Sequence, residues 1–429
     1  MGKYFSIKSI SKIIAIILAI IILNFMIIQL NTVIENNSIV SNNNRAWEKV
    51  APSQNETFDK VATSVNKSSS SVVIEESTLR VLDGYNKDLR LEMASTTKIM
   101  TAMVAIENIE LDNEITVADE AVGVEGSSIY LKYNEIWTIR DLLYGLMLRS
   151  GNDAAVAIAI AVGGSVDGFV KMMNEKAEDL GLKNTHFENP NGLHGESHYT
   201  SAYDLAVISA HAMRNEDFKK IVGTKMYTVS ANETHPTYYF ANKNKLLYNY
   251  DGANGIKTGY TTDSGRCLVS SAERNGMQLI SVVLNIYDTY GTCSAGMDKA
   301  FNEYIPVEIG QKGDILESID VEGDQYDVAL ENSLVLPLKE GENLGLSCKF
   351  NISGDSSLPL QSGSVIGKIE FYNDNRLLFS ANIVNINEIN DIGVLRKLSA
   401  YVGDWRVSYT NGKTEQIFGV YRSGFKTER

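Results

Sequence analysis

A nearly unbroken run of apolar residues stands close to the start of the chain, from Ile13 to Leu30. Lys3, Lys8 and Lys12 precede it, and no small-x-small cleavage site follows it. Its length of about 18 residues is enough to span a bilayer and is long for the core of a signal peptide. We therefore predict that residues 1–35 are a retained membrane anchor in preference to a removed signal, with the lysines cytoplasmic and the rest of the chain outside.

Polar residues dominate the next segment, 36–70, which is rich in Asn and Ser and lacks apolar periodicity. We predict a flexible linker there. Short apolar runs at 72–74 and 79–82 flank a polar connection, which favours a β-hairpin. Apolar residues then recur at helical spacing in the segment that begins at Ser95, which predicts an amphipathic helix.

Two apolar segments, 141–148 and 154–162, occupy the middle of the chain, and the second is apolar nearly all round, as expected of a buried central helix. Strand-like runs at 267–273 and 277–284 flank an Asn-Gly pair, the strongest short hairpin signal. Strands at both ends therefore bracket a helical middle. For residues 71–305 we predict an α/β (α+β) domain, in which an antiparallel sheet carries helices on both faces.

The last third of the chain has a different pattern. Residues 306–388 are strand-like and punctuated by glycines, which predicts a small, sandwich-like all-β domain. Residues 389–429 carry apolar side chains at roughly helical spacing with basic residues between them. We predict a C-terminal tail whose apolar face packs on protein in preference to lying on a membrane.

Charge and cysteine content narrow the possible functions. The formal net charge of -14 argues against a nucleic-acid partner, because phosphate binding needs clustered Lys and Arg. It also means that an anionic substrate must be held by local cations. Cys267, Cys293 and Cys348 allow at most one disulfide and show no paired metal spacing, so we predict that each is a small buried hydrophobe. We predict no metal and no cofactor.

The first candidate for chemistry is Ser95-Thr96-Thr97-Lys98. A spacing of three places the serine and the lysine on one helical face, and the lysine can take the hydroxyl proton if its pKa is lowered by burial and a second cation. The helix N-terminus would offer N–H groups to an oxyanion. The motif alone is a weak signal, because Ser9 with Lys12 and Ser64 with Lys67 match it without a catalytic context.

Two further motifs follow in the sequence. Ser150-Gly151-Asn152 lies in the tight connection between the two buried segments, where a hydroxyl and an amide could face a cleft; alone, it could equally be a helix cap. Lys257-Thr258-Gly259 occurs once, before the late hairpin. A lysine beside a threonine hydroxyl suits a substrate carboxylate, and the glycine lets a peptide approach the strand closely. Alone, this lysine could simply lie on a solvated edge strand.

Together and in this order, the three motifs resemble those of the penicillin-recognising serine acyltransferases, whose catalytic domain has a β-lactamase/transpeptidase-like fold. The closer similarity is to the low-molecular-mass D-alanyl-D-alanine carboxypeptidases, peptidase family S11. It covers about residues 71–305, and the following β region is similar to that family's small C-terminal domain. The similarity is carried by Ala94, Ile99-Met100-Thr101, Asn189-Pro190-Asn191-Gly192-Leu193 and Gly255-Ile256-Lys257-Thr258-Gly259-Tyr260-Thr261.

The resemblance implies a role for each matching residue. Ser95 would be acylated by the penultimate D-alanine of peptidoglycan pentapeptide stems, with Lys98 as the base. Ser150 and Asn152 would relay protons and hold the peptide. Lys257 and Thr258, with Gly259 beside them, would receive the terminal carboxylate.

The backbone N–H groups of Ser95 and Tyr260 would form the oxyanion hole. β-Lactam antibiotics would acylate the same serine, on the outer face of a bacterial cell membrane. Family members commonly pair a cleaved signal with a C-terminal amphipathic anchor, so the apolar run near the start of this chain departs from that pattern.

Three alternatives stay open. A class A β-lactamase shares the three-motif plan but needs a carboxylate for deacylation, and Glu188 and Asn191 stand three apart where that class has four. A zinc carboxypeptidase would use His194, Glu196 and His198, which we expect to be surface residues because no helical pattern holds them. A catalytically silent penicillin-binding protein would capture its ligand without cleaving it.

Overall fold

The structure is a computed structural model that describes residues 68–342, 346–353, 358–373 and 376–400, together with the strands 404–408 and 417–421. All of these residues belong to one compact unit, Asn66–Arg429. The predicted anchor and all but the end of the predicted linker lie outside the described residues. Within the described part, no single helix is long and apolar enough to cross a bilayer, and one bent pair, Asn152–Gly163 with Val166–Asp179, passes that test together.

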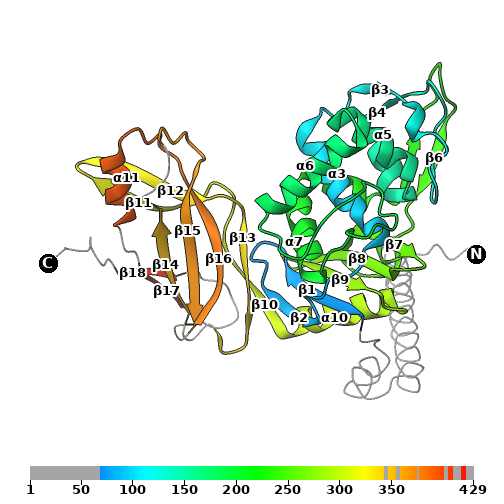
Figure 1. The fold of residues 1–429 in the computed structure, drawn as a ribbon. Helices are drawn as coiled ribbons and strands as arrows, with labels where there is room; N and C mark the ends of the chain where they lie inside the picture. Colours follow the sequence, from blue (N-terminus) through cyan, green and yellow to red (C-terminus); the bar gives the residue numbers. More distant parts are fainter. Residues whose placement is uncertain are drawn as a thin grey trace, which may run out of the picture. The chain divides into compact units, whose positions relative to one another are not determined.

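A five-stranded antiparallel sheet forms the middle of the first domain, with the strand order β2-β1-β9-β8-β7 (Figure 1). Its strands come from the two ends of the domain: β1 Ser70–Glu75, β2 Val81–Tyr85, β7 Ala253–Thr261, β8 Gly265–Arg274 and β9 Met277–Leu284. Both predicted hairpins are confirmed, since β1 pairs with β2 and β8 with β9 in antiparallel register. The strand β7 lies at the edge of the sheet, so one side of its backbone has no neighbouring strand.

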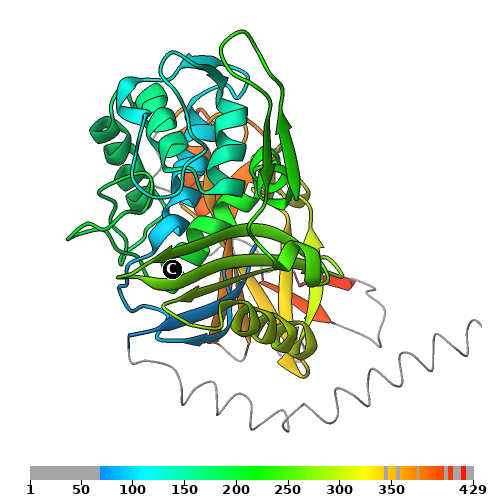
Figure 2. The ribbon, with the colours of Figure 1, turned by 90° about the vertical axis from the view of Figure 1, so that its right-hand side faces the viewer.

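Helices cover both faces of this sheet, as predicted. Successive side chains of a strand point to opposite faces, so Val73, Leu279 and Val283 pack against one helix, α10 (Thr289–Glu303). Val72 and Ile280 point the other way, into the larger core built by the helices α3 (Lys98–Asn108), α5 (Asn152–Gly163) and α7 (Ala202–Met213). Figure 2 shows the sheet between α10 and this helical layer.

The remaining elements of the first domain surround that helical layer. They are α4 Ile139–Tyr144, α6 Val166–Asp179, α8 Glu216–Gly223, α9 Leu246–Asn249, the short helical turns η1 Ala94–Thr97, η2 Asp119–Ala121 and η3 Gly145–Arg149, and the paired strands β3 Glu114–Thr116 with β4 Ile136–Thr138 and β5 Met226–Val229 with β6 Tyr238–Ala241. Side chains of Thr138, Ser165, Ser201, Asn215 and Asp288 cap the first turns of α4, α6, α7, α8 and α10.

The second domain is a small β domain with its own apolar core. A seven-stranded sheet has the order β11-β12-β16-β15-β14-β17-β18, and β10 pairs separately with β13. The strands are β10 Tyr304–Gly310, β11 Ile315–Val321, β12 Asp324–Leu330, β13 Leu334–Lys339, β14 Leu346–Ile352, β15 Val365–Asn373, β16 Arg376–Asn385, β17 Asp404–Ser408 and β18 Ile417–Tyr421. This architecture confirms the predicted small β domain.

The segment predicted as a separate tail contributes elements to this second domain. The helix α11 (Ile392–Ser399) buries Leu395 and Leu398 completely in the apolar core, so its apolar face packs on protein. The strand β17 then pairs with β14 and extends the sheet. The three cysteines are free and buried, as predicted.

Candidate active site

Ser95 lies on a tight turn between β2 and the first long helix. The turn Ala94–Thr97 is a 3-10 helix, and the α-helix α3 begins only at Lys98. The prediction of an ordinary amphipathic helix from Ser95 is therefore wrong by one turn. Two hydroxyls stabilise the turn by hydrogen bonds to its backbone. Thr96 Oγ1 donates to Met93 O (2.5 Å), and Thr97 Oγ1 donates to Ala94 O (2.8 Å). Ala94 has a φ of +47°, in the left-handed region that L residues rarely occupy.

Lys98 is completely buried, and its amine lies directly against the serine. Lys98 Nζ is 3.1 Å from Ser95 Oγ and 2.7 Å from Asn152 Oδ1, and it also contacts Asn191 O. Burial, followed by the positive charge of Lys257, holds the pKa of Lys98 well below its usual range. A neutral amine has two N–H groups for the two amide oxygens and one lone pair for the Ser95 proton. The surroundings of Lys98 thus suit a general base.

Ser150 lies in the connection before α5, and Asn152 is the first residue of that helix. Ser150 has a φ of +66° and is buried, and within the described residues its hydroxyl has no hydrogen-bond partner. Asn152 accepts from Lys98 and donates through Nδ2 to Glu125 O (2.6 Å). One side chain of this motif therefore contacts the candidate base, while the hydroxyl of the other is free to bond a ligand.

The neighbouring Asp153 fixes a loop beside the site. Its buried carboxylate accepts hydrogen bonds from Ser128 Oγ at 2.5 Å and from the backbone nitrogens of Ile129 and Leu131, each at 3.1 Å. Together with the Asn152–Glu125 bond, these contacts attach the loop that precedes Leu131 to the first turn of α5. Sequence reasoning missed Asp153, although it directly follows a predicted site residue.

The third motif lies on the edge strand β7, directly against the serine turn. A β-carbon at position 259 would lie 3.3 Å from the backbone nitrogen of Ser95 and 3.2 Å from Met93 O. Glycine at this position is what allows strand and turn to come so close. Thr258 is half-buried and Tyr260 is 67% exposed at the mouth of the site.

Lys257 is the second buried lysine of this site. Its Nζ donates to Thr258 O (2.9 Å), and burial, assisted by the charge of Lys243, lowers its pKa to about 7. A carboxylate bound beside it would favour the charged form and raise that pKa again. The charge of Lys243 also lowers the pKa of Lys98, and no motif distinguishes this exposed lysine from the others in the sequence.

The expectation that the histidine cluster lies on the surface is wrong for His198. His198 is only 3% exposed, and its ring bonds Thr97 of the serine turn. His194 is exposed and bonds Glu92 (2.7 Å), and the possible metal ligands that come together with it are Glu92 and Asp263, not Glu196 and His198. The geometry of the predicted zinc alternative is therefore not present.

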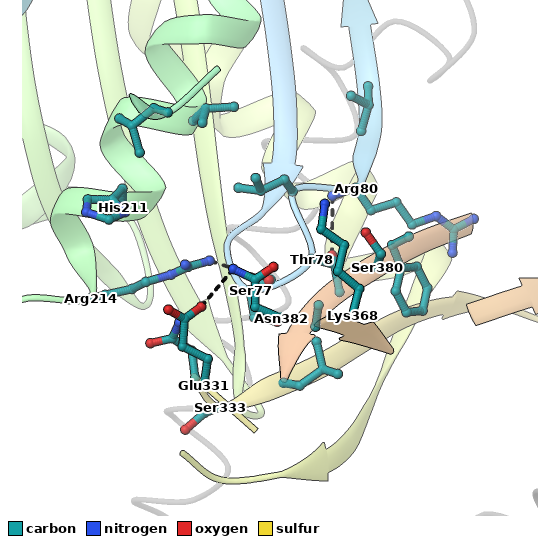
Figure 3. Close-up of a pocket in the computed structure, with 18 of the residues that line it drawn as sticks. Ser77, Thr78, Arg80, His211, Arg214, Glu331, Ser333, Lys368, Ser380 and Asn382 are labelled. Carbon is teal, nitrogen blue, oxygen red and sulfur yellow. Dashed lines mark hydrogen bonds between the residues drawn. The ribbon is translucent and has the colours of Figure 1, made fainter. Parts of the chain in front are cut away.

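A large cleft lies away from all of these residues. It has a volume of about 1330 Å³ and is lined by the β1–β2 turn, α7 and the strand β16 of the second domain (Figure 3). Its lining is polar and includes Arg80, Arg214 and Lys368, but none of the predicted site residues. This cleft and the cluster of ionisable groups with shifted pKa values thus lie in different places. We take the cluster as the candidate active site, because there the Ser95 hydroxyl lies against the buried amine of Lys98.

Comparison with known proteins gives consistent matches over both domains. Residues 56–287 match the family model described as D-alanyl-D-alanine carboxypeptidase, and residues 304–391 match the model of the C-terminal domain of penicillin-binding protein 5. The chain is 32% identical to D-alanyl-D-alanine carboxypeptidase DacF of Bacillus subtilis over 352 residues, which covers 79% of this chain and 90% of the relative.

Solved structures give the same result. Penicillin-binding protein 5 from Haemophilus influenzae is similar with a TM-score of 0.59 and 29% identity, over 75% of this chain and 97% of that one. The D-alanyl-D-alanine carboxypeptidase DacD from Francisella tularensis is similar with a TM-score of 0.56 and 26% identity, over 76% of this chain and 94% of that one.

Proposed function

Because the chain belongs to the D-alanyl-D-alanine carboxypeptidase family of peptidases, we propose that it removes the terminal D-alanine from peptidoglycan pentapeptide stems through an acyl-enzyme on Ser95. One observation carries the assignment of Ser95. The amine of Lys98 is buried between the Ser95 hydroxyl and two amide oxygens, with its pKa lowered.

Acylation begins when Ser95 Oγ attacks the carbonyl carbon of the penultimate D-alanine. Its proton passes to the lone pair of Lys98 Nζ, and the carbonyl becomes an oxyanion that faces the N–H groups of Ser95 and Tyr260. The C–N bond then breaks, and the amine of the departing D-alanine receives a proton, which Ser150 relays from Lys98. Water repeats the same steps on the ester and releases the shortened peptide.

The terminal carboxylate supplies the binding energy that orients the substrate. Lys257 and the hydroxyl of Thr258 receive it, and Asn152 holds the peptide amide. In a protein with a net charge of -14, the local positive charge of Lys257 must offset the repulsion of an anionic peptide. In the empty site, burial lowers the pKa of Lys257, so that only part of the amine is protonated at neutral pH. A bound carboxylate raises this pKa again and restores the charge.

β-Lactams enter the same scheme because they present a reactive amide and a carboxylate in the place of the peptide end. They acylate Ser95 and remain attached while deacylation is slow. The enzyme acts on the cell wall outside the cytoplasm, and the apolar run near its N-terminus serves as the retained anchor.

The test uses the full chain in detergent with a peptide that ends in two D-alanines. We expect release of free D-alanine, loss of release in Ser95→Ala, and unchanged release in the presence of a chelator. Rapid turnover of penicillin would indicate a β-lactamase. Penicillin labelling without release of D-alanine would indicate a silent binding protein, and loss of activity with the chelator would indicate a zinc enzyme.

A further inference from the structure

His198 lies outside the three motifs, yet it is buried against the serine turn in a single possible tautomer. The backbone N–H of Glu188 donates to His198 Nδ1 at 3.0 Å, so this nitrogen must carry a lone pair. Burial lowers the pKa of His198 to about 4, so the ring is neutral at physiological pH. The hydrogen of the neutral ring is therefore on Nε2, which lies 2.8 Å from Thr97 Oγ1.

The tautomer of His198 determines in which hydrogen bond the Thr97 hydroxyl is the donor and in which it is the acceptor. Because Nε2 presents a hydrogen, Thr97 Oγ1 accepts it and directs its own hydrogen to Ala94 O, 2.8 Å away. Four groups form a hydrogen-bond relay with one direction, from the Glu188 N–H through the His198 ring and the Thr97 hydroxyl to the Ala94 carbonyl oxygen. Each buried donor and acceptor in it is used once.

The end of the relay controls the group next to the nucleophile. Ala94 O and the N–H of Ser95 belong to one planar peptide unit, so the direction of one fixes the direction of the other. That N–H is a donor of the proposed oxyanion hole. Ala94 also holds a left-handed φ of +47°, so its peptide needs external contacts to stay in this orientation.

The loop that bears His198 makes a second contact with the Ala94 carbonyl, through Gly192. At Gly192, whose φ is +84°, a β-carbon would lie 2.0 Å from Ala94 O, so the loop packs on this oxygen without room for a side chain. The adjacent Asn191 O contacts Lys98 Nζ. His198 thus joins the loop to the turn at the point where both the base and the oxyanion donor are held.

We propose that His198 is a positioning residue which, through Thr97 and the Ala94 carbonyl, aims the Ser95 N–H at the developing oxyanion. This inference rests on the proposed function, because it assigns His198 a part in the acylation and deacylation of Ser95. A purely structural role would predict lower stability with unchanged rate constants. A direct role in substrate binding would instead predict weaker initial binding. We do not expect this, because His198 itself touches no part of the open site.

The experiment measures three constants for a chromogenic β-lactam on the full chain: dissociation of the first complex, acylation and deacylation. In His198→Leu we expect both chemical steps to slow by about 10- to 100-fold, somewhat less than the loss of a whole oxyanion donor, while initial binding changes less than threefold. His198→Gln keeps a donor and an acceptor and should stay within about fivefold of the wild type. His211→Gln, at a partly exposed position of α7 where the ring contacts Glu107, is the matched control and should leave all three constants unchanged.

A second route tests the relay without touching the histidine. Thr97→Val keeps the shape of the side chain and removes the hydroxyl, and it should slow both steps like His198→Leu. The double variant should be no slower than either single variant, because the two residues act in series. If His198→Leu does not fold, Thr97→Val measured beside His198→Gln makes the same test.

Three results would overturn the inference while the wild type is acylated normally. They are rate constants within threefold of the wild type in His198→Leu and Thr97→Val, a loss confined to initial binding, or additive losses in the double variant. A wild-type chain that no β-lactam acylates would overturn the proposed function, and this inference with it.

Discussion

The two domains fill their interiors with different chemistry. The first domain buries eight acidic, basic or histidine side chains: Glu75, Lys98, Glu135, Asp153, His198, Asp204, His235 and Lys257. In the second domain, among the residues whose burial is described, Asn385 is the one buried polar side chain, and its Oδ1 has no hydrogen-bond partner. Buried ionisable groups cost stability unless they are paired, so a domain that keeps eight of them keeps them for another reason.

Glu75 shows that this other reason is not always catalysis. Its carboxylate accepts bonds from the backbone nitrogens and hydroxyls of Ser77 and Thr78, and burial raises its pKa to about 7. This turn contacts the second domain, since Ser77 Oγ accepts from the Val335 nitrogen. Glu75 therefore shapes an interdomain turn, whereas Lys98 and His198 surround Ser95, the proposed nucleophile. The contrast predicts that substitutions inside the first domain change rates and substitutions inside the second change stability.

Lys98→Met gives the largest expected effect. The methionine has a similar length and no base, so acylation of Ser95 by penicillin should fall by about 10³-fold or more. The melting temperature should change little, because the desolvation cost of a buried amine is removed while the oxygens of Asn152 and Asn191 lose their donor. Lys171→Met on the exposed surface of α6 is the matched control. Acylation within tenfold of the wild type would remove Lys98 from the role of base.

Phe371→Ala tests the second domain. Phe371 is completely buried and packs on Phe379 at 4.9 Å, so its truncation should lower the free energy of unfolding by about 3–5 kcal/mol. The acylation rate at 25 °C should stay within twofold. Ile392→Ala, at a partly exposed position of α11, should cost less than about 1 kcal/mol. A parallel loss of acylation in Phe371→Ala would show that the two interiors are coupled.

The protonation of His198 should make the free energy of unfolding depend on pH. Its pKa is about 4 in the folded protein and near 6.5 in the unfolded chain, so the unfolded chain binds more protons in between. Stability should therefore fall by about 3 kcal/mol as the pH falls from above 6.5 to 4. Glu75, with its raised pKa, acts in the opposite direction. We therefore compare the free energy of unfolding of the wild type with that of His198→Gln across this pH range. If the difference between the two free energies does not change with pH, a buried neutral ring is contradicted.

The smallest effect concerns the contact between the domains. Arg80 forms a bidentate ion pair with Glu342, in which each terminal nitrogen of the guanidinium donates to one carboxylate oxygen, and it also contacts Pro337 O. Both side chains are partly exposed, so a double-mutant cycle with Arg80→Met and Glu342→Gln should give a coupling energy of about 1 kcal/mol. Acylation should not change. A coupling of zero would mean that the pair does not stabilise the contact.

Local patterns were sufficient for much of this fold. The Asn275-Gly276 turn and its flanking apolar runs predicted the β8–β9 hairpin, and the apolar segment 154–162 lies within the buried helix α5. The 3-10 turn at Ser95 was not predictable in the same way. Its left-handed Ala94 depends on contacts with Gly192 and Gly259, which are distant in the sequence.

The same limit applies to the site. The spacing of Ser95 and Lys98 is local and could be read directly, but the partners of Lys98 come from 54 and 93 residues away. His198 lies 101 residues from Thr97, in a stretch without helical or strand periodicity. Its sequence context gave no sign of burial, so only the folded loop revealed it.

Mass spectrometry after exposure of the full chain to penicillin tests the central claim most directly. We predict a single covalent adduct, located by fragmentation on Ser95, which is absent from Ser95→Ala and forms much more slowly in Lys98→Met. An adduct on any other residue, or none at all, would contradict the assignment of Ser95 as the nucleophile.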